Sequence, residues 1–226
     1  MSWIPDEIGY AGQEHLDAGY VAGYDAKAQV DPSEDIEILR WHGLGPGTTI
    51  VDLGAGTGVF TAAAAATGAT VIAVDVSPPM ASHLRDRFGD ADNVTVVEAG
   101  FLTYAHAGAP AEFVHCRNAL HQLPDFWKGI ALARMRDMLR PEGILRVRDL
   151  VFDFDPDEAD EFIPAWMEGG VDDPRRGWTP DELAEHVRLE FSTYRWLFEP
   201  MLERAGFEIL TVEYARRAYG AYTCRR

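Results

Sequence analysis

From residue 48 onward, short apolar runs alternate with longer stretches in which apolar residues recur at helical spacing. The runs have the length of buried strands, and strands that alternate with helices are typical of βαβ units in a parallel sheet. The pattern therefore predicts an α/β fold with a doubly wound sheet. The expected strands cover residues 48–53, 69–75, 93–98, 111–116 and 142–150, and the expected helices cover 57–67, 78–89 and 124–139.

The flanking segments follow a different pattern. Residues 1–47 contain two helical stretches, and residues 9–30 have few large aliphatic residues; together they predict an N-terminal helical lid on a core of residues 48–226. Residues of about 153–198 break the alternation and predict a helical insertion on the substrate side, with Thr179 and Pro180 starting one of its helices. Pro200 predicts two helical pieces in place of one. Residues 207–214 and 218–223 predict a closing antiparallel pair.

A glycine-rich stretch, Asp52-Leu53-Gly54-Ala55-Gly56-Thr57-Gly58, follows the first expected strand. Such a strand–turn–helix junction lets the backbone approach a ligand closely. The dinucleotide fingerprint would need a glycine where Val59 stands, so an NAD-dependent oxidoreductase is the weaker alternative. Asp75 ends the next apolar run, where a carboxylate can accept hydrogen bonds from ribose hydroxyls. The stretch and Asp75 together predict an adenosine-type ligand without a pyrophosphate.

These residues resemble two motifs of the class I S-adenosylmethionine-dependent methyltransferases. Residues 51–58 are similar to the first motif and residues 74–77 to the second. The resemblance continues through residues 98–101 and 117–123, and the latter are similar to the H-x-L segment of small-molecule methyltransferases of the quinone-methylating type. It implies S-adenosyl-L-methionine as cofactor and a seven-stranded, mostly parallel sheet in the order 3-2-1-4-5-7-6 with a helical lid.

The resemblance also implies which residues hold the cofactor. Many relatives carry an acid where Ala99 or Gly100 stands, to bind the adenine amino group, so backbone N–H groups near Phe101 are the expected donors here. The cofactor-binding residues implied in this way are Asp52, Gly54, Ala55, Gly56, Gly58, Asp75, Val76, Met80, Gly100, Phe101, Asn118 and Ala119.

The sequence gives fewer indications of which residues bind the substrate or take part in the reaction. His121 follows the fourth strand and is expected to face the cleft. It is either a general base, a loop residue that hydrogen-bonds to the backbone, or a residue that only shapes the pocket. Tyr20 and Tyr24 lie four residues apart on one helical face, either as part of a lid over the cofactor and substrate or as a core aromatic pair. Arg148 and Asp149 are either a pair that orients substrate or a buried ion pair. The expected reaction is methyl transfer to an O- or C-nucleophile of a small molecule by in-line displacement. A protein that uses the cofactor for a non-methylating reaction is the alternative.

The composition of the chain limits the kinds of partner that it is expected to bind. The chain has 20 Lys and Arg against 37 Asp and Glu, a net charge of −17, and such a surface repels nucleic acid. The two cysteines and seven histidines have no metal-ligand spacing, so no metal is expected. No apolar run approaches the roughly 20 residues that cross a bilayer, and no signal peptide is recognisable. The expectation is a cytoplasmic monomer or homodimer that binds a small molecule, without a membrane or nucleic-acid partner.

Overall fold

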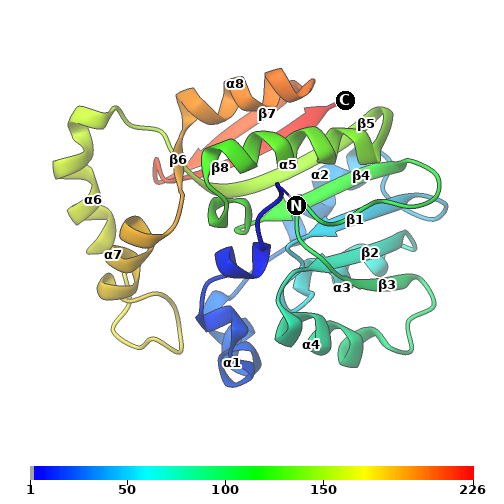
Figure 1. Ribbon diagram of the computed structural model, residues 1–226, viewed down its shortest axis with the longest axis horizontal. Helices are drawn as coiled ribbons and strands as arrows, with labels where there is room; N and C mark the ends of the chain where they lie inside the picture. Colours follow the sequence, from blue (N-terminus) through cyan, green and yellow to red (C-terminus); the bar gives the residue numbers. More distant parts are fainter. Residues whose placement is uncertain (1–2) are drawn as a thin grey trace.

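A twisted sheet runs through the centre of the molecule (Figure 1). The computed structural model describes residues 3–226, and the first two residues of the expected lid lie outside this part. The strand order of the sheet is β3-β2-β1-β4-β5-β8-β7, and the two-residue strand β6 pairs beside the end of β5. With β6 set aside, this is the expected order 3-2-1-4-5-7-6, which is confirmed. The strands are β1 (Thr49–Leu53), β2 (Thr70–Asp75), β3 (Val94–Glu98), β4 (Ala111–Arg117), β5 (Leu139–Phe152), β6 (Thr193–Tyr194), β7 (Glu208–Ala215) and β8 (Tyr219–Arg225).

The register of the parallel strands brings their carboxyl ends to one edge. β1 pairs in parallel with β2 and β4, with Leu53 opposite both Val74 and Cys116. β8 is antiparallel to both β5 and β7. The loops that leave β1, β2 and β4 therefore meet at the same edge, beside the point where the strand order reverses. Open α/β sheets bind their ligands in this position.

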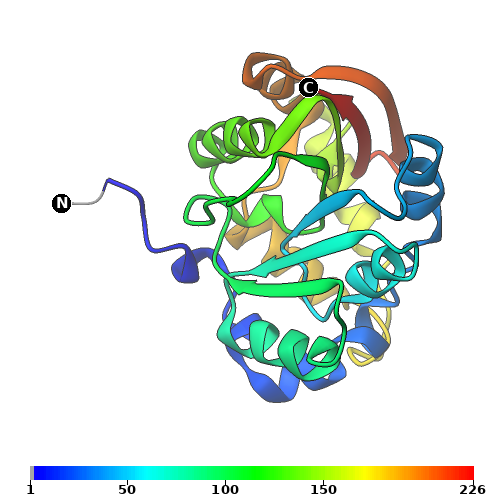
Figure 2. The same ribbon diagram turned by 90° about the vertical axis from the view of Figure 1, so that its right-hand side faces the viewer.

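Helices cover both faces of the sheet, as Figure 2 shows. Helices α5 (Asp125–Met138) and α8 (Arg195–Ala205) pack side by side on one face, over a core that includes Val114, Leu145 and Tyr222. Helices α2 (Ser33–Trp41) and α3 (Val59–Ala65) cover the other face. Helix α4 (Pro78–Phe88) packs against β2 and β3. Because both faces are covered, β2 is apolar between its end residues, whereas β4 and β5 bury the polar residues His115, Arg146 and Asp149.

Helix α8 is continuous, so the predicted break at Pro200 is wrong. Proline removes one backbone hydrogen bond from a helix, and an unsupported helix would break at that point. Here Phe198 and Leu202 flank the proline and are buried against the core at 1% and 0% exposure. Burying a large apolar side chain contributes roughly 1.5–3 kcal/mol. The burial of these two side chains therefore stabilises the helical path more than the missing hydrogen bond weakens it.

The remaining elements gather at the carboxyl edge of the sheet and beside it. They are η1 (Glu7–Tyr10), η2 (Glu14–Leu16), α1 (Ala18–Ala28), η3 (Leu120–Gln122), η4 (Pro156–Glu158), α6 (Ala159–Met167) and α7 (Pro180–Leu189). Helix α7 begins after Thr179 as expected. A capping box forms there, in which the Thr179 hydroxyl accepts from the Glu182 N–H and the Glu182 carboxylate accepts from the Thr179 N–H. Buried Lys27 on α1 pairs with Glu182 at 2.5 Å, which ties α1 to α7.

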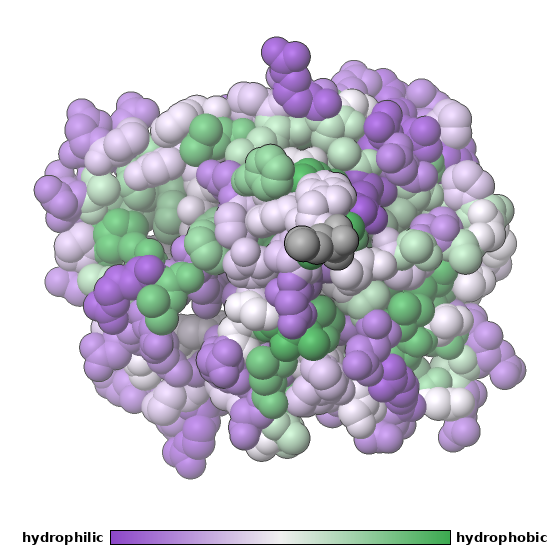
Figure 3. All heavy atoms as spheres, in the orientation of Figure 1, coloured by the Kyte–Doolittle hydropathy of each residue, from purple (hydrophilic) through white to green (hydrophobic). Residues whose placement is uncertain are grey.

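Hydrophilic side chains dominate the margins of the face shown in Figure 3, and hydrophobic residues form smaller patches between them. Within residues 3–226, no helix has the length and apolar character that crossing a membrane requires.

Candidate functional site

The glycine-rich turn after β1 adopts a conformation that favours glycine at three positions. Gly54, Gly56 and Gly58 have φ angles of 72°, 56° and 83°. A Cβ on Gly54 would lie 2.5 Å from the Ala119 Cβ, and one on Gly58 would lie 2.5 Å from the Phe88 ring. A Cβ on Gly56 would meet no described atom within 4 Å. Gly54 and Gly58 therefore permit close packing within the protein, whereas Gly56 faces open space.

Asp75 connects this turn to the end of β2. Its two carboxylate oxygens accept hydrogen bonds from the N–H groups of Gly56 at 2.8 Å and Ser77 at 2.9 Å. The residue is only 8% exposed, and this burial raises the pKa of its carboxyl group above the ordinary range. Each carboxylate oxygen has two acceptor sites, so Asp75 retains capacity for the hydroxyl groups of a ligand.

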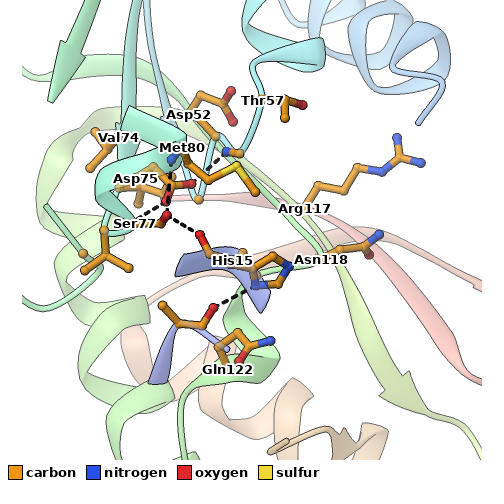
Figure 4. A pocket seen from close by; sticks show the side chains of 18 of the residues that line it. His15, Asp52, Thr57, Val74, Asp75, Ser77, Met80, Arg117, Asn118 and Gln122 are labelled. Atoms are coloured by element: carbon orange, nitrogen blue, oxygen red, sulfur yellow. Dashed lines mark hydrogen bonds between the residues drawn. The ribbon is translucent and has the colours of Figure 1, made fainter. Parts of the chain in front are cut away.

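A cavity opens at the carboxyl ends of β1, β2 and β4, with the turn and Asp75 in its wall (Figure 4). Eleven of the twelve residues expected to hold the cofactor line it, and Gly58 does not because it packs against α4. Tyr24 also lines the cavity, whereas Tyr20, His121 and Arg148 do not. Several lining residues were not expected from the sequence: Glu7, Tyr10, His15, Thr57, Ser77, His115, Arg117 and Gln122.

Glu7 is the most informative of these unexpected residues. It is 4% exposed, and its carboxylate accepts from the Leu102 N–H at 2.9 Å and the Thr103 hydroxyl at 2.8 Å. A Cβ on Gly100 would lie 2.4 Å from the Glu7 carboxylate, so only glycine leaves room for it there. The N-terminal segment thus supplies a carboxylate at the position where the β3 loop has none. Sequence spacing gives no signal for this contact, because Glu7 lies 95 residues before Leu102.

His15 and two tyrosines cover one side of the cavity. The His15 backbone carbonyl accepts from the Ser77 hydroxyl at 2.6 Å, which attaches η2 to the loop after β2. The His15 ring contacts the Tyr20 and Tyr24 rings edge-on, with centroids 5.8 and 5.7 Å away. Burial and the nearby Asp75 charge raise the pKa of Tyr24 to about 12, so its phenol is protonated at neutral pH and can donate a hydrogen bond. The expected aromatic pair is therefore present, with one member in the cavity wall.

Below the turn, Asp52 belongs to a buried polar network. Its carboxylate contacts His115 Nδ1 at 2.8 Å and accepts from the Thr61 hydroxyl at 2.6 Å. The His115 ring stacks on Phe60 with centroids 3.4 Å apart, and its Nε2 lies 4.0 Å from Asp35. Asp52 lines the cavity, but both of its oxygens already have protein partners. Its main effect is to hold β4 and α3 against β1 below the cavity floor.

Arg148 and Asp149 do not pair with each other, because consecutive residues of a strand point to opposite faces. Arg148 lies 2.6 Å from Glu34 and 3.5 Å from Asp35, both on α2. Asp149 accepts from the Leu120 N–H at 2.7 Å on the other face. Both alternatives for an Arg148–Asp149 pair are therefore wrong. Arg148 is an ion-pair partner of α2.

His121 lies apart from the cavity wall. It is 6% exposed, with Nδ1 2.5 Å from Asp149 and Nε2 3.0 Å from Glu190. Burial alone would lower the pKa of this imidazole, but the two carboxylates outweigh it and raise the pKa to about 9. The expected position facing the cleft is wrong, because both ring nitrogens are engaged by protein groups. Its role as a base stays a prediction.

Comparison with known proteins agrees with this geometry. Residues 50–143 match the family described as a methyltransferase domain. An uncharacterized methyltransferase of Geobacillus sp. (strain WCH70) is 28% identical over 132 residues, which are 58% of this chain and 61% of the relative. The alignment thus spans less than two thirds of that relative's length.

Two solved structures show the same fold. The magnesium protoporphyrin IX methyltransferase of Synechocystis PCC 6803, with bound S-adenosylhomocysteine, matches with a TM-score of 0.68 and 13% identity over 98% of this chain and 100% of that one. The Burkholderia thailandensis 1,6-didemethyltoxoflavin-N1-methyltransferase, with bound 1,6-didemethyltoxoflavin and S-adenosylhomocysteine, matches with a TM-score of 0.58 and 23% identity over 84% and 76% of the two chains.

The chain thus shares the fold of S-adenosylmethionine-dependent methyltransferases, and its residues 50–143 match a methyltransferase-domain family, which implies S-adenosylmethionine as the cofactor. The cavity residues fit that group. Gly56 leaves the backbone open toward the cavity, and two buried carboxylates, Asp75 and Glu7, line it; carboxylates can accept hydrogen bonds from hydroxyl and amino groups but would repel a pyrophosphate.

Proposed function

We propose that this chain methylates an O- or C-nucleophile of a small molecule by in-line displacement. The observation that carries the proposal is the cavity at the carboxyl edge, which is lined by Asp75, by the open backbone at Gly56 and by the aromatic side chains of His15 and Tyr24. Polar groups able to hold an adenosine moiety and apolar groups able to exclude water thus occupy one site.

The cofactor supplies an already activated methyl group, so the protein's contribution is to bind, orient and exclude water. Asp75 would accept from the ribose hydroxyls. Glu7 would accept from the adenine amino group, and the backbone N–H of Phe101 would donate to the adenine ring. Asn118 and Ala119, which line the cavity after β4, would border the methionine part.

The acceptor would enter on the side covered by the N-terminal segment. His15, Tyr24 and Gln122 line the cavity there. Residues 3–28 would act as the lid, attached to the core through the Ser77 hydroxyl and to α7 through Lys27. Closure of such a cover would keep water from the methyl group during transfer.

Two further observations support a small molecule as the acceptor. The two structural neighbours are named for magnesium protoporphyrin IX and 1,6-didemethyltoxoflavin, both small molecules. The net charge of −17 disfavours a nucleic-acid acceptor, because phosphates are repelled at long range.

The test is to incubate the protein with S-adenosylmethionine and fractions of a metabolite extract, together with a panel of phenols and quinols. Mass spectrometry would follow S-adenosylhomocysteine and a product heavier by one CH₂ group. We expect both in equal amounts, and we expect neither with Gly56→Val. A transformed acceptor that gains no methyl group, without S-adenosylhomocysteine, would contradict the proposal and favour a non-methylating use of the cofactor. Calorimetric binding of NADH in place of S-adenosylmethionine would contradict the cofactor assignment.

A further inference from the structure

Three side chains that could ligate a metal converge beside the cavity. They are His121 on η3, His186 on α7 and Glu190, which directly follows α7. Their ligand atoms all lie within 4.8 Å of one another. His121 Nε2 is 3.0 Å from Glu190 Oε2, and His186 Nδ1 contacts the same oxygen. Two imidazole nitrogens and one carboxylate oxygen therefore face a common point.

The other nitrogen of each imidazole has its own partner. His121 Nδ1 lies 2.5 Å from Asp149, whose side chain is 3% exposed, and His186 Nε2 lies 2.7 Å from the Ser192 hydroxyl. Histidines that ligate metals almost always have such an outer partner, which holds the ring and selects the tautomer. The arrangement thus leaves Nε2 of His121 and Nδ1 of His186 as the two nitrogens that point inward.

A second observation concerns Glu190 itself. Its Oε2 atom is buried and lies within ion-pair distance of both imidazoles, but within residues 3–226 neither they nor any other donor is aligned with it for a hydrogen bond. A buried carboxylate oxygen that lacks an aligned donor carries a desolvation cost of roughly 1–3 kcal/mol or more. A cation at the point that both imidazoles face would satisfy this oxygen.

We propose that His121, His186 and Glu190 bind one divalent transition-metal ion of the zinc class. Two imidazole nitrogens and a carboxylate oxygen suit zinc, and three protein ligands leave a tetrahedral position for a further group. Magnesium and calcium prefer all-oxygen ligand sets and are disfavoured. The role of His121 under this proposal is a ligand.

The site would join the substrate-side insertion to the core. His186 and Glu190 belong to the insertion, whereas His121 and Asp149 belong to the loop after β4 and to β5. Gln122 lines the cavity, and its amide nitrogen lies 3.3 Å from His121 Nε2, so the cluster borders the cavity wall. The Phe191 N–H also donates to the His121 carbonyl at 2.9 Å, which fixes the same junction.

The test is metal titration of the full chain after removal of any affinity tag and treatment with a chelator. Isothermal calorimetry with Zn²⁺ alone should give one ion per chain, and Co²⁺ should give the visible absorption of a four-coordinate site. His186→Gln should weaken Zn²⁺ binding more than tenfold, and Ser192→Ala should weaken it about 10- to 100-fold through loss of the outer partner. His42→Gln is the matched control, because His42 is an exposed histidine at the end of α2, and it should bind as the parent does.

His186 is only partly buried, so His186→Gln is expected to fold, and its circular dichroism and melting temperature would verify this. Absence of stoichiometric Zn²⁺ binding to the parent chain would overturn the proposal, and the cluster would then be a histidine–carboxylate network that fastens α7. Equal Zn²⁺ affinity of the parent and His186→Gln would overturn it as well. Neither outcome bears on methyl transfer, since the readout is metal binding alone.

Discussion

Replacing Asp75 with alanine should separate cofactor binding from the rest of the fold. The carboxylate lies in the cavity wall and is the acceptor proposed for the ribose hydroxyls. A hydrogen bond to a charged group contributes about 1.5–3 kcal/mol, so S-adenosylhomocysteine should bind roughly 10- to 150-fold more weakly to Asp75→Ala.

The same substitution should also lower stability. The N–H groups of Gly56 and Ser77 lose their acceptor, and each buried unsatisfied donor costs about 1–3 kcal/mol. Calorimetry at a temperature where thermal melting shows the variant to be folded keeps the two effects apart. Glu98→Ala is the matched control. Glu98 lies opposite Asp75 in the register of β3 and β2, is paired with Arg85 at 3.0 Å, and does not line the cavity.

The pH dependence of cofactor affinity follows from the same residue. Burial raises the pKa of Asp75, so its ionised form is fully present above that raised pKa and is lost as the pH falls through it. Affinity for S-adenosylhomocysteine should therefore begin to fall at a higher pH than an ordinary aspartate would give. Asp75→Ala should lose this dependence, whereas Glu98→Ala should keep it. Full affinity in Asp75→Ala, or the same pH profile in parent and variant, would refute the assignment.

Three further outcomes are expected. Gly56→Ala should lose cofactor affinity but keep most of its stability, apart from a cost of about 1–2 kcal/mol for a side chain at positive φ. Gly58→Ala should lose more stability, because its Cβ would meet α4. Thermal melting and calorimetry on both variants check this. Asp35→Asn should destabilise the fold by about 3–5 kcal/mol because buried Arg146, at 2.8 Å, loses its partner, as urea unfolding would measure. Burial would raise the pKa of Asp35, but His115 and Arg146 outweigh it and lower the pKa. The stability that ionised Asp35 contributes is therefore fully present above the ordinary value of 3.8 and is lost as the pH falls below it. A difference in unfolding free energy between parent and variant that stays constant down to pH 2 would contradict this.

Much of the fold could be predicted from local pattern. Apolar runs of strand length and apolar residues at helical spacing predicted the parallel sheet and its flanking helices. They could do so because the spacing of apolar residues within an element shows which of its faces is buried. The position of the glycine-rich turn was also predictable, since three glycines and Asp75 follow or end adjacent strands, and parallel strands bring their carboxyl ends together. Pro200 shows where local pattern was insufficient. Its helix is held by the burial of Phe198 and Leu202, which depends on the packed core.

The other features depend on contacts between distant parts of the chain, which only the tertiary structure decides. Glu7 reaches the β3 loop across 95 residues, and no local pattern marks it. His121 follows β4 as expected, but Asp149 and Glu190 hold its ring beside the cavity rather than in it. The sequence predicted no metal site because its histidines are scattered. His186 and Glu190, four residues apart, are two of the three residues of the cluster, and only the fold brings His121 into contact with them. Ion pairs and ligand sets need side chains from several elements to meet at one point, and that meeting is a property of the folded chain alone.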